Sequence, residues 1–179
     1  MSGIVCVRMN WDRTAIPLPI QRYHMLHFGP EPGHPFGRRG LAMAGAWQQL
    51  GGDSAGMLVL DGDVVIDPVD HDAMFAAIDK EPDAVHVAPV KLWPVSTHLD
   101  GWVWGHGLEF FSAKDPSRPD RFSFCYTYLP KRLLEACIKS GMDEWHYPGV
   151  DQKVSKVCRE LGIPIRVARS CQPKHLNYA

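Results

Sequence analysis

The stretch "GMLVLDGDVVIDP", Gly56 to Pro68, joins an uninterrupted apolar run to two closely spaced carboxylates. Met57 to Leu60 are all apolar, which is typical of a short strand buried on both faces of a sheet. Asp61 and Asp63 follow at once, with Gly62 between them. Burial of the strand would fix the position of the turn at its end. The stretch therefore predicts a core strand that presents two carboxylates at its carboxyl end.

Working outward from this strand, the sequence alternates between helical and strand-like segments. A helix with Met43, Trp47 and Leu50 on its apolar side precedes the strand, and Gly51-Gly52 ends it. Further helices are expected in 67–83, 130–141 and 147–162, and strands in 4–9, 84–93, 122–129 and 163–168. A hairpin or strand pair is expected in 100–111, a long loop in 27–40, and an irregular tail in 169–179.

This alternation predicts one domain of 179 residues, 1–179, with an α/β fold. The sheet is expected to be central and mostly parallel, with helices on its flanks. Ligands of such sheets bind beyond the carboxyl ends of the strands, which is where Asp61 and Asp63 fall.

The composition excludes several classes of protein. A net charge of −1 argues against a nucleic-acid partner, which usually selects a basic surface. The five cysteines include no CxxC pair, so we expect buried thiols in a reduced, cytoplasmic protein rather than a cysteine zinc site. No signal peptide and no transmembrane segment is expected, because no apolar run approaches the roughly 18 residues that a spanning helix needs.

The two aspartates allow a structural and a functional interpretation. Asp-Gly is a common turn dipeptide, so Asp61-Gly62-Asp63 can be a turn without chemistry. Two neighbouring carboxylates repel each other unless a cation lies between them. A divalent ion such as Mn²⁺ or Mg²⁺ accepts one or two carboxylates and completes its shell with water and substrate phosphates. The functional interpretation is therefore a site for a metal ion and a diphosphate.

The region "GRRGLAMAGAWQQLGGDSAGMLVLDGDVVIDP" resembles the signature region of the glycosyltransferases with the GT-A fold. These Rossmann-related enzymes have a basic, glycine-containing turn, a helix of small residues, and an apolar strand that ends in D-x-D. The resemblance implies that Asp63 is the direct metal ligand and that Asp61 contacts the ribose or a metal-bound water, at the edge of the metal site. The metal would hold the diphosphate of a nucleotide sugar.

The last third of the chain extends the resemblance. "YPGVDQKVSKVCRELGIPIRV" is similar to a late segment of the family, in which an acidic residue begins a helix that leads to a strand. In inverting members this acid is the general base, and the matching residue is Asp151. The family often has a third metal ligand, a histidine in the C-terminal tail, for which "PKHLNY" offers His175. For Asp151, helix capping is an equal interpretation.

Other residues are weaker candidates. Arg38 and Arg39 suit diphosphate oxygens, with a solvated basic pair as the alternative, and Lys174 is a further phosphate candidate. Arg8 is interpreted as a surface residue, with nucleotide contact as the alternative. Aromatic faces stack on sugars, so an acceptor or sugar wall is predicted, with core packing as the alternative; its members are Trp102, Trp104, His106 and Trp145.

Together these features predict a metal-dependent, inverting glycosyltransferase of the hexosyltransferase type. Its donor would be a nucleoside-diphosphate sugar, with a UDP-sugar favoured, and its acceptor a hydroxyl on a small molecule, a glycan or a protein. Two alternatives stay open: a nucleotidyltransferase, and a nucleotide- or carbohydrate-binding module without turnover. A homodimer is also compatible with the sequence.

Overall fold

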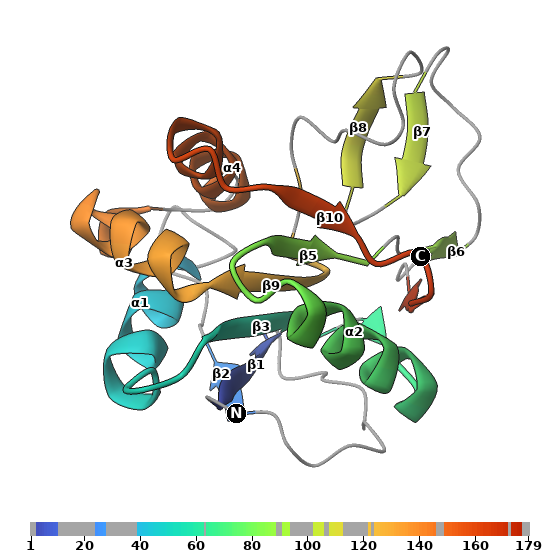
Figure 1. Ribbon diagram of the computed structural model, residues 1–179, viewed down its shortest axis with the longest axis horizontal. Coiled ribbons are helices and arrows are strands. Elements are labelled where there is room, and N and C mark those ends of the chain that lie inside the picture. Colours follow the sequence, from blue (N-terminus) through green and yellow to red (C-terminus); the bar gives the residue numbers. More distant parts are fainter. Residues whose placement is uncertain are drawn as a thin grey trace.

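The protein is built around one six-stranded sheet (Figure 1). The structure is a computed structural model that describes residues 3–10, 24–27, 39–62, 64–88, 91–93, 102–105, 108–112, 122, 124–145, 149–171 and 173–176. The strand order is β10-β5-β9-β3-β1-β2. The bounds are β1 (Ile4–Asn10), β2 (His24–His27), β3 (Gly56–Asp61), β5 (Val85–Val87), β9 (Tyr126–Pro130) and β10 (Ile165–Val167).

The sheet is mostly parallel, as the sequence predicts. Strand β1 pairs in parallel with both β2 and β3, and β10 pairs in parallel with β5. Strand β9 is the exception, because it runs antiparallel to its neighbours β3 and β5. Three parallel strands, β1, β2 and β3, therefore end at the same edge of the sheet, and Asp61 is the last residue of β3.

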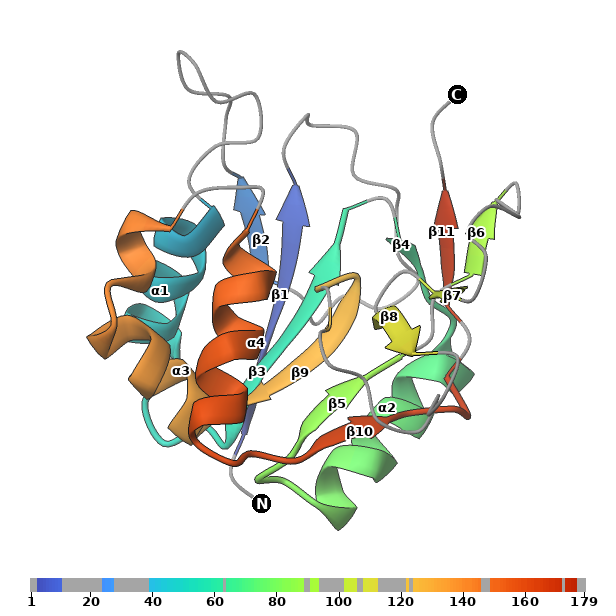
Figure 2. The ribbon, with the colours of Figure 1, turned by 90° about the horizontal axis from the view of Figure 1, so that it is seen from above.

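Helices cover both faces of the sheet (Figure 2). Helices α1 (Arg39–Leu50), α3 (Lys131–Lys139) and α4 (Val150–Glu160) lie on one face, with the short 3₁₀ helix η1 (Met142–Glu144) beside α1. Helix α2 (Pro68–Lys80) lies on the other face. Its start is set locally, because the side chain of Asp67 accepts a hydrogen bond of 2.8 Å from the Asp70 amide and Pro68 occupies the first turn.

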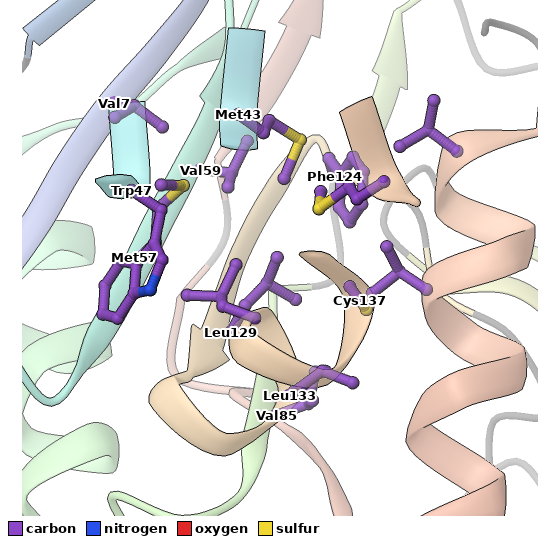
Figure 3. Close-up of a cluster of buried hydrophobic side chains, with 14 of the residues drawn as sticks. Val7, Met43, Trp47, Met57, Val59, Val85, Phe124, Leu129, Leu133 and Cys137 are labelled. Atoms are coloured by element: carbon purple, nitrogen blue, oxygen red, sulfur yellow. The ribbon is translucent and has the colours of Figure 1, made fainter. Parts of the chain in front are cut away.

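Strand β3 is buried on both sides, which confirms the interpretation of its apolar run. Met57 and Val59 belong to the core beneath α1, α3 and α4, and this core is shown in Figure 3. Leu58 and Leu60 belong to a second core beneath α2. Because successive side chains of a strand point to opposite faces, the alternation places Asp61 on the α1 face.

Smaller sheets form in addition to the central one. Strand β11 (Lys174–Leu176) pairs antiparallel with β4 (Val64–Val65) and parallel with β6 (Lys91–Trp93). Strands β7 (Trp102–Gly105) and β8 (Leu108–Ser112) form a separate antiparallel pair, which confirms the expected hairpin or strand pair.

Three sequence-based expectations are wrong. The tail is not irregular throughout, because it forms β11. The single strand expected in 84–93 is two strands, β5 and β6, in different sheets; Pro89 lies between them and has no amide hydrogen for a strand ladder. Helix α1 does not bury Leu50, which is 39% exposed at the helix end. The edge strand β2, which contains His24 and His27, was not anticipated.

All five cysteines are buried, as the sequence predicts. Within the described residues, no helix combines the length and the apolar character that a membrane span requires.

Candidate functional site

Asp61 and Arg39 form a buried ion pair at the carboxyl edge of the sheet. Asp61 ends β3 and Arg39 begins α1, and the Nη2 atom of Arg39 contacts the Oδ1 atom of Asp61. The two residues are 6% and 4% exposed. The alternative of a solvated basic pair is therefore wrong for Arg39.

The surroundings of Arg39 keep it positively charged. Burial opposes the charge, but the nearby carboxylates of Asp61 and Asp151 outweigh it and raise the pKa of Arg39. The guanidinium also lies over the ring of Phe124, with its Cζ atom 4.9 Å from the ring centroid. Among the described residues, its buried Nε atom has no hydrogen-bond partner. Arg39 is thus a cation that is held in place, and its Nε–H group has no partner among the described residues.

Asp151 is the second carboxylate near Arg39. It is the second residue of α4 and is half-buried, and its Oδ1 atom accepts a hydrogen bond of 3.1 Å from the Gln152 amide. Burial raises the pKa of Asp151, although Arg39 and the backbone hydrogen bonds oppose the shift. A raised pKa makes a carboxylate a stronger base, which is the property that a general base needs.

Hydrogen bonds fix the backbone around Asp61. The Asp61 amide donates to the Cys125 carbonyl at 3.0 Å. The Nη2 atom of Arg8, in β1, donates to the Gly62 carbonyl at 2.6 Å. Arg8 is only 2% exposed, so its interpretation as a surface residue is wrong.

A glycine allows the start of α1 to approach η1 closely. The Gly40 amide donates to the Trp145 carbonyl at 3.3 Å. A Cβ atom at Gly40 would overlap the Met142 carbonyl oxygen and would lie 2.7 Å from that of Trp145. Because both obstacles are backbone atoms, α1 and η1 would have to separate, and Arg39 would move with α1.

We expect Gly40→Ala to destabilise the protein by about 1–3 kcal/mol through overpacking. Gly45→Ala in the same helix is the matched control, because a Cβ atom there meets nothing within 4 Å. The control should stabilise the protein by about 0.5–1 kcal/mol, since alanine favours a helix. Urea unfolding of both variants measures the difference, and equal effects would contradict the close approach.

The remaining predicted site residues are only partly described. Asp63, Arg38 and His106 lie outside the described residues. Lys174 and His175 lie in β11, and the register places the backbone of His175 opposite Val64, the residue after Asp63. The pairing of β4 with β11 therefore places Val64 and His175, which are distant in sequence, on adjacent strands. Trp102 and Trp104 lie in β7, which belongs to the separate two-stranded sheet and not to the central one.

Trp145 is the one predicted aromatic residue whose side chain is described. It is 8% exposed and packs in the core beneath α1. The Nζ atom of Lys153 lies 5.5 Å from the centroid of its ring. The structure thus gives Trp145 a packing role, and acceptor contact stays a prediction.

The possible ligand atoms in the described part of the site suit a hard divalent cation, because Asp61 and Asp151 offer carboxylate oxygen atoms. One oxygen of Asp61 is already engaged by Arg39. In the described part of the chain, no three histidine, cysteine or acidic side chains gather closely enough to hold a metal. A metal here would need Asp63 and His175 in addition, the residues that the resemblance implies.

Sequence reasoning missed the roles of Arg8 and Phe124 and the pairing of Arg39 with Asp61. One signal was available for Arg8. It interrupts the apolar strand "IVCVRM" at a position that alternation assigns to a core face. No local pattern pairs Arg39 with Asp61, because 22 residues separate them.

The fold is shared with solved structures of low sequence identity. The structure "A197 from STIV" matches with a TM-score of 0.57 and 13% identity, over 97% of this chain and 86% of that one. A glycosyltransferase involved in glycosylation of the major capsid of PBCV-1 matches with a TM-score of 0.57 and 14% identity, over 99% of this chain and 95% of that one.

A third structure, CMP:2-keto-3-deoxy-manno-octonic acid synthetase complexed with CTP, matches with a TM-score of 0.50 and 11% identity, over 93% of this chain and 89% of that one. No family model matches the sequence, and no curated protein matches it. These likenesses establish a GT-A-like fold for the chain.

Proposed function

We propose that this chain is a metal-dependent glycosyltransferase that moves a sugar from a nucleoside-diphosphate sugar to an acceptor hydroxyl. One observation carries the proposal: β3, α1 and α4 bring Asp61, Arg39 and Asp151 together at the carboxyl edge of the sheet. Ligands of α/β sheets bind at this edge. Support also comes from the fold, which one glycosyltransferase among the similar structures shares.

Each residue has a distinct part in the proposed reaction. Asp151 accepts the proton of the acceptor hydroxyl as the oxygen attacks the anomeric carbon, and the bond from that carbon to the diphosphate oxygen breaks. One displacement of this kind inverts the configuration of the sugar. Arg39 stays charged and supplies a fixed positive charge near the anionic nucleotide sugar. A bound Mn²⁺ or Mg²⁺ would neutralise charge on the leaving diphosphate, and Asp63, Asp61 and His175 are the residues proposed to hold it.

The test is turnover of a panel of nucleotide sugars with and without Mn²⁺, read as release of nucleoside diphosphate. We expect release from at least one UDP-sugar, dependent on Mn²⁺ and accelerated by an acceptor. Asp79→Ala, on the exposed side of α2, is a control that should keep the parent rate. Release from no donor under any condition would contradict the proposal.

A nucleotidyltransferase is the second candidate, and the likeness to the CTP-bound synthetase favours it. The two reactions release different products. A nucleotidyltransferase transfers the nucleoside monophosphate group of a nucleoside triphosphate to a sugar and releases the other two phosphates as pyrophosphate, whereas a glycosyltransferase releases a nucleoside diphosphate. Measuring pyrophosphate from nucleoside triphosphates and a set of sugars therefore separates the two.

Thermal shift distinguishes either enzyme from a plain sugar-binding module. We expect UDP to raise the melting temperature only when Mn²⁺ is present, because a bound metal ion would supply the positive charge that holds the diphosphate. UDP at one hundred times its Kd should add about 2.7 kcal/mol to stability. Stabilisation by free sugars and none by UDP with Mn²⁺ would indicate a carbohydrate-binding module instead.

A further inference from the structure

Arg8 occupies a place in the core where a charge is costly. Val7 and Met9, its neighbours in β1, belong to the core beneath α1, so alternation turns Arg8 to the α2 face. On that face, Cys6 of the same strand and Leu60 of β3 belong to an apolar cluster. A buried guanidinium is tolerated only where hydrogen bonds compensate its lost hydration.

The contact of Arg8 with Gly62 is directed at the predicted metal-binding turn. Its Nη2 atom donates to the Gly62 carbonyl at 2.6 Å, across 54 residues of sequence. Hydrogen bonds from a charged donor are about twice as strong as those between neutral groups. Gly62 is the middle residue of Asp61-Gly62-Asp63, and glycine is the residue with the greatest backbone freedom.

Two arginines therefore hold consecutive residues of this turn from opposite faces of the sheet. Arg39 holds the Asp61 carboxylate on the α1 face, and Arg8 holds the Gly62 carbonyl from the α2 face. The Gly62 carbonyl belongs to the peptide plane that leads into Asp63, and this plane is rigid. Fixing the carbonyl thus fixes the orientation of the peptide group that follows Gly62.

We propose that Arg8 is a positioning residue that sets the affinity of the Asp61-Gly62-Asp63 turn for a divalent metal and its bound diphosphate. This inference rests on the proposed function, since it assigns the turn to metal binding. Residues that orient metal ligands typically change metal affinity by about 10–100-fold when they are replaced. The loss of Arg8 should therefore appear in metal binding, beyond its effect on stability.

The experiment measures the Kd of Mn²⁺, by electron paramagnetic resonance of the free ion, in the presence of UDP. The variants are Arg8→Met, which removes the donor, and Arg8→Lys, which keeps the charge and one donor group. The control is Tyr128→Phe, which removes another hydrogen bond of the same core, the one of 3.1 Å from the Tyr128 hydroxyl to the Pro82 carbonyl. Thermal melts establish that each variant is folded at the temperature of the titration.

We expect Arg8→Met to weaken Mn²⁺ binding by about 10–100-fold, Arg8→Lys to weaken it less, and Tyr128→Phe to leave it unchanged. If Arg8→Met does not fold, a weakened Kd in Arg8→Lys still supports the inference. Folded Arg8 variants with the parent Kd, or a Tyr128→Phe variant weakened equally, would overturn it while leaving the proposed function intact. A parent protein that binds neither Mn²⁺ nor UDP would instead overturn the proposed function, and this inference with it.

Discussion

Asp151→Asn is expected to lower the rate of sugar transfer by about 10²–10⁴-fold while UDP binding stays near that of the parent. The amide keeps the size of the carboxylate but cannot accept the proton of the acceptor hydroxyl. Asp151 is half-buried beside Arg39, so the substitution removes a charge without opening a cavity. Single-turnover rates and calorimetric UDP titration measure the two quantities.

The pH dependence of transfer checks the same assignment. Burial raises the pKa of Asp151 above about 3.9, the ordinary value for aspartate. As pH falls through this raised pKa, Asp151 becomes protonated and can no longer act as a base. The effect of pH on stability is the opposite of that for most aspartates, whose pKa is lowered on folding. A raised folded-state pKa contributes stability that is present below the unfolded value and is lost as pH rises through the folded one.

At neutral pH the charged form of Asp151 therefore opposes folding, and the neutral asparagine should not lower the melting temperature. A variant that transfers sugar at the parent rate would contradict the role of Asp151 as base. An Asp151→Asn variant that is inactive only because it unfolds at a lower temperature than the parent would also contradict this role.

Arg39→Met is expected to destabilise the protein by about 3–5 kcal/mol, because it leaves the Asp61 carboxylate buried without its partner. The double variant Arg39→Met/Asp61→Leu should recover most of this loss, since two apolar side chains of similar volume need no hydration. Urea unfolding of the parent, both single variants and the double variant gives the coupling energy of the pair.

Arg166→Met is the matched control for an exposed pair. Arg166 binds both oxygens of Glu81 at 2.7 Å, but the two side chains are 50% and 40% exposed. Water and salt screen such a pair, so the expected loss is about 1 kcal/mol or less. An Arg39→Met variant no less stable than Arg166→Met would contradict the burial of the Arg39–Asp61 pair.

The parts of the fold that depend on local pattern were predictable from sequence. The apolar run of β3 and the helical spacing of Met43 and Trp47 in α1 each reflect burial against a nearby layer. The position of Asp61 at the end of β3 follows from the same run. The α/β class follows from the alternation of such segments.

The parts that depend on distant partners were not predictable. Strand β11 exists because Val64–Val65 and Lys91–Trp93 pair with it, and nothing in the tail itself indicates those partners. The burial of Arg8 depends on Gly62, and the burial of Arg39 depends on Asp61. Buried charges are therefore the features that the sequence signals least, because each is stable only with a partner that the fold supplies.

The proposed function requires the Asp61-Gly62-Asp63 segment to bind a nucleoside diphosphate through a divalent metal. The most direct measurement is calorimetric titration of UDP into the parent, Asp63→Ala and the control Asp79→Ala, each with Mn²⁺ and with a chelator. We expect UDP to bind the parent and Asp79→Ala with Mn²⁺ only, and to lose this binding in Asp63→Ala. Binding of UDP and Mn²⁺ to Asp63→Ala with the affinity of the parent would contradict it.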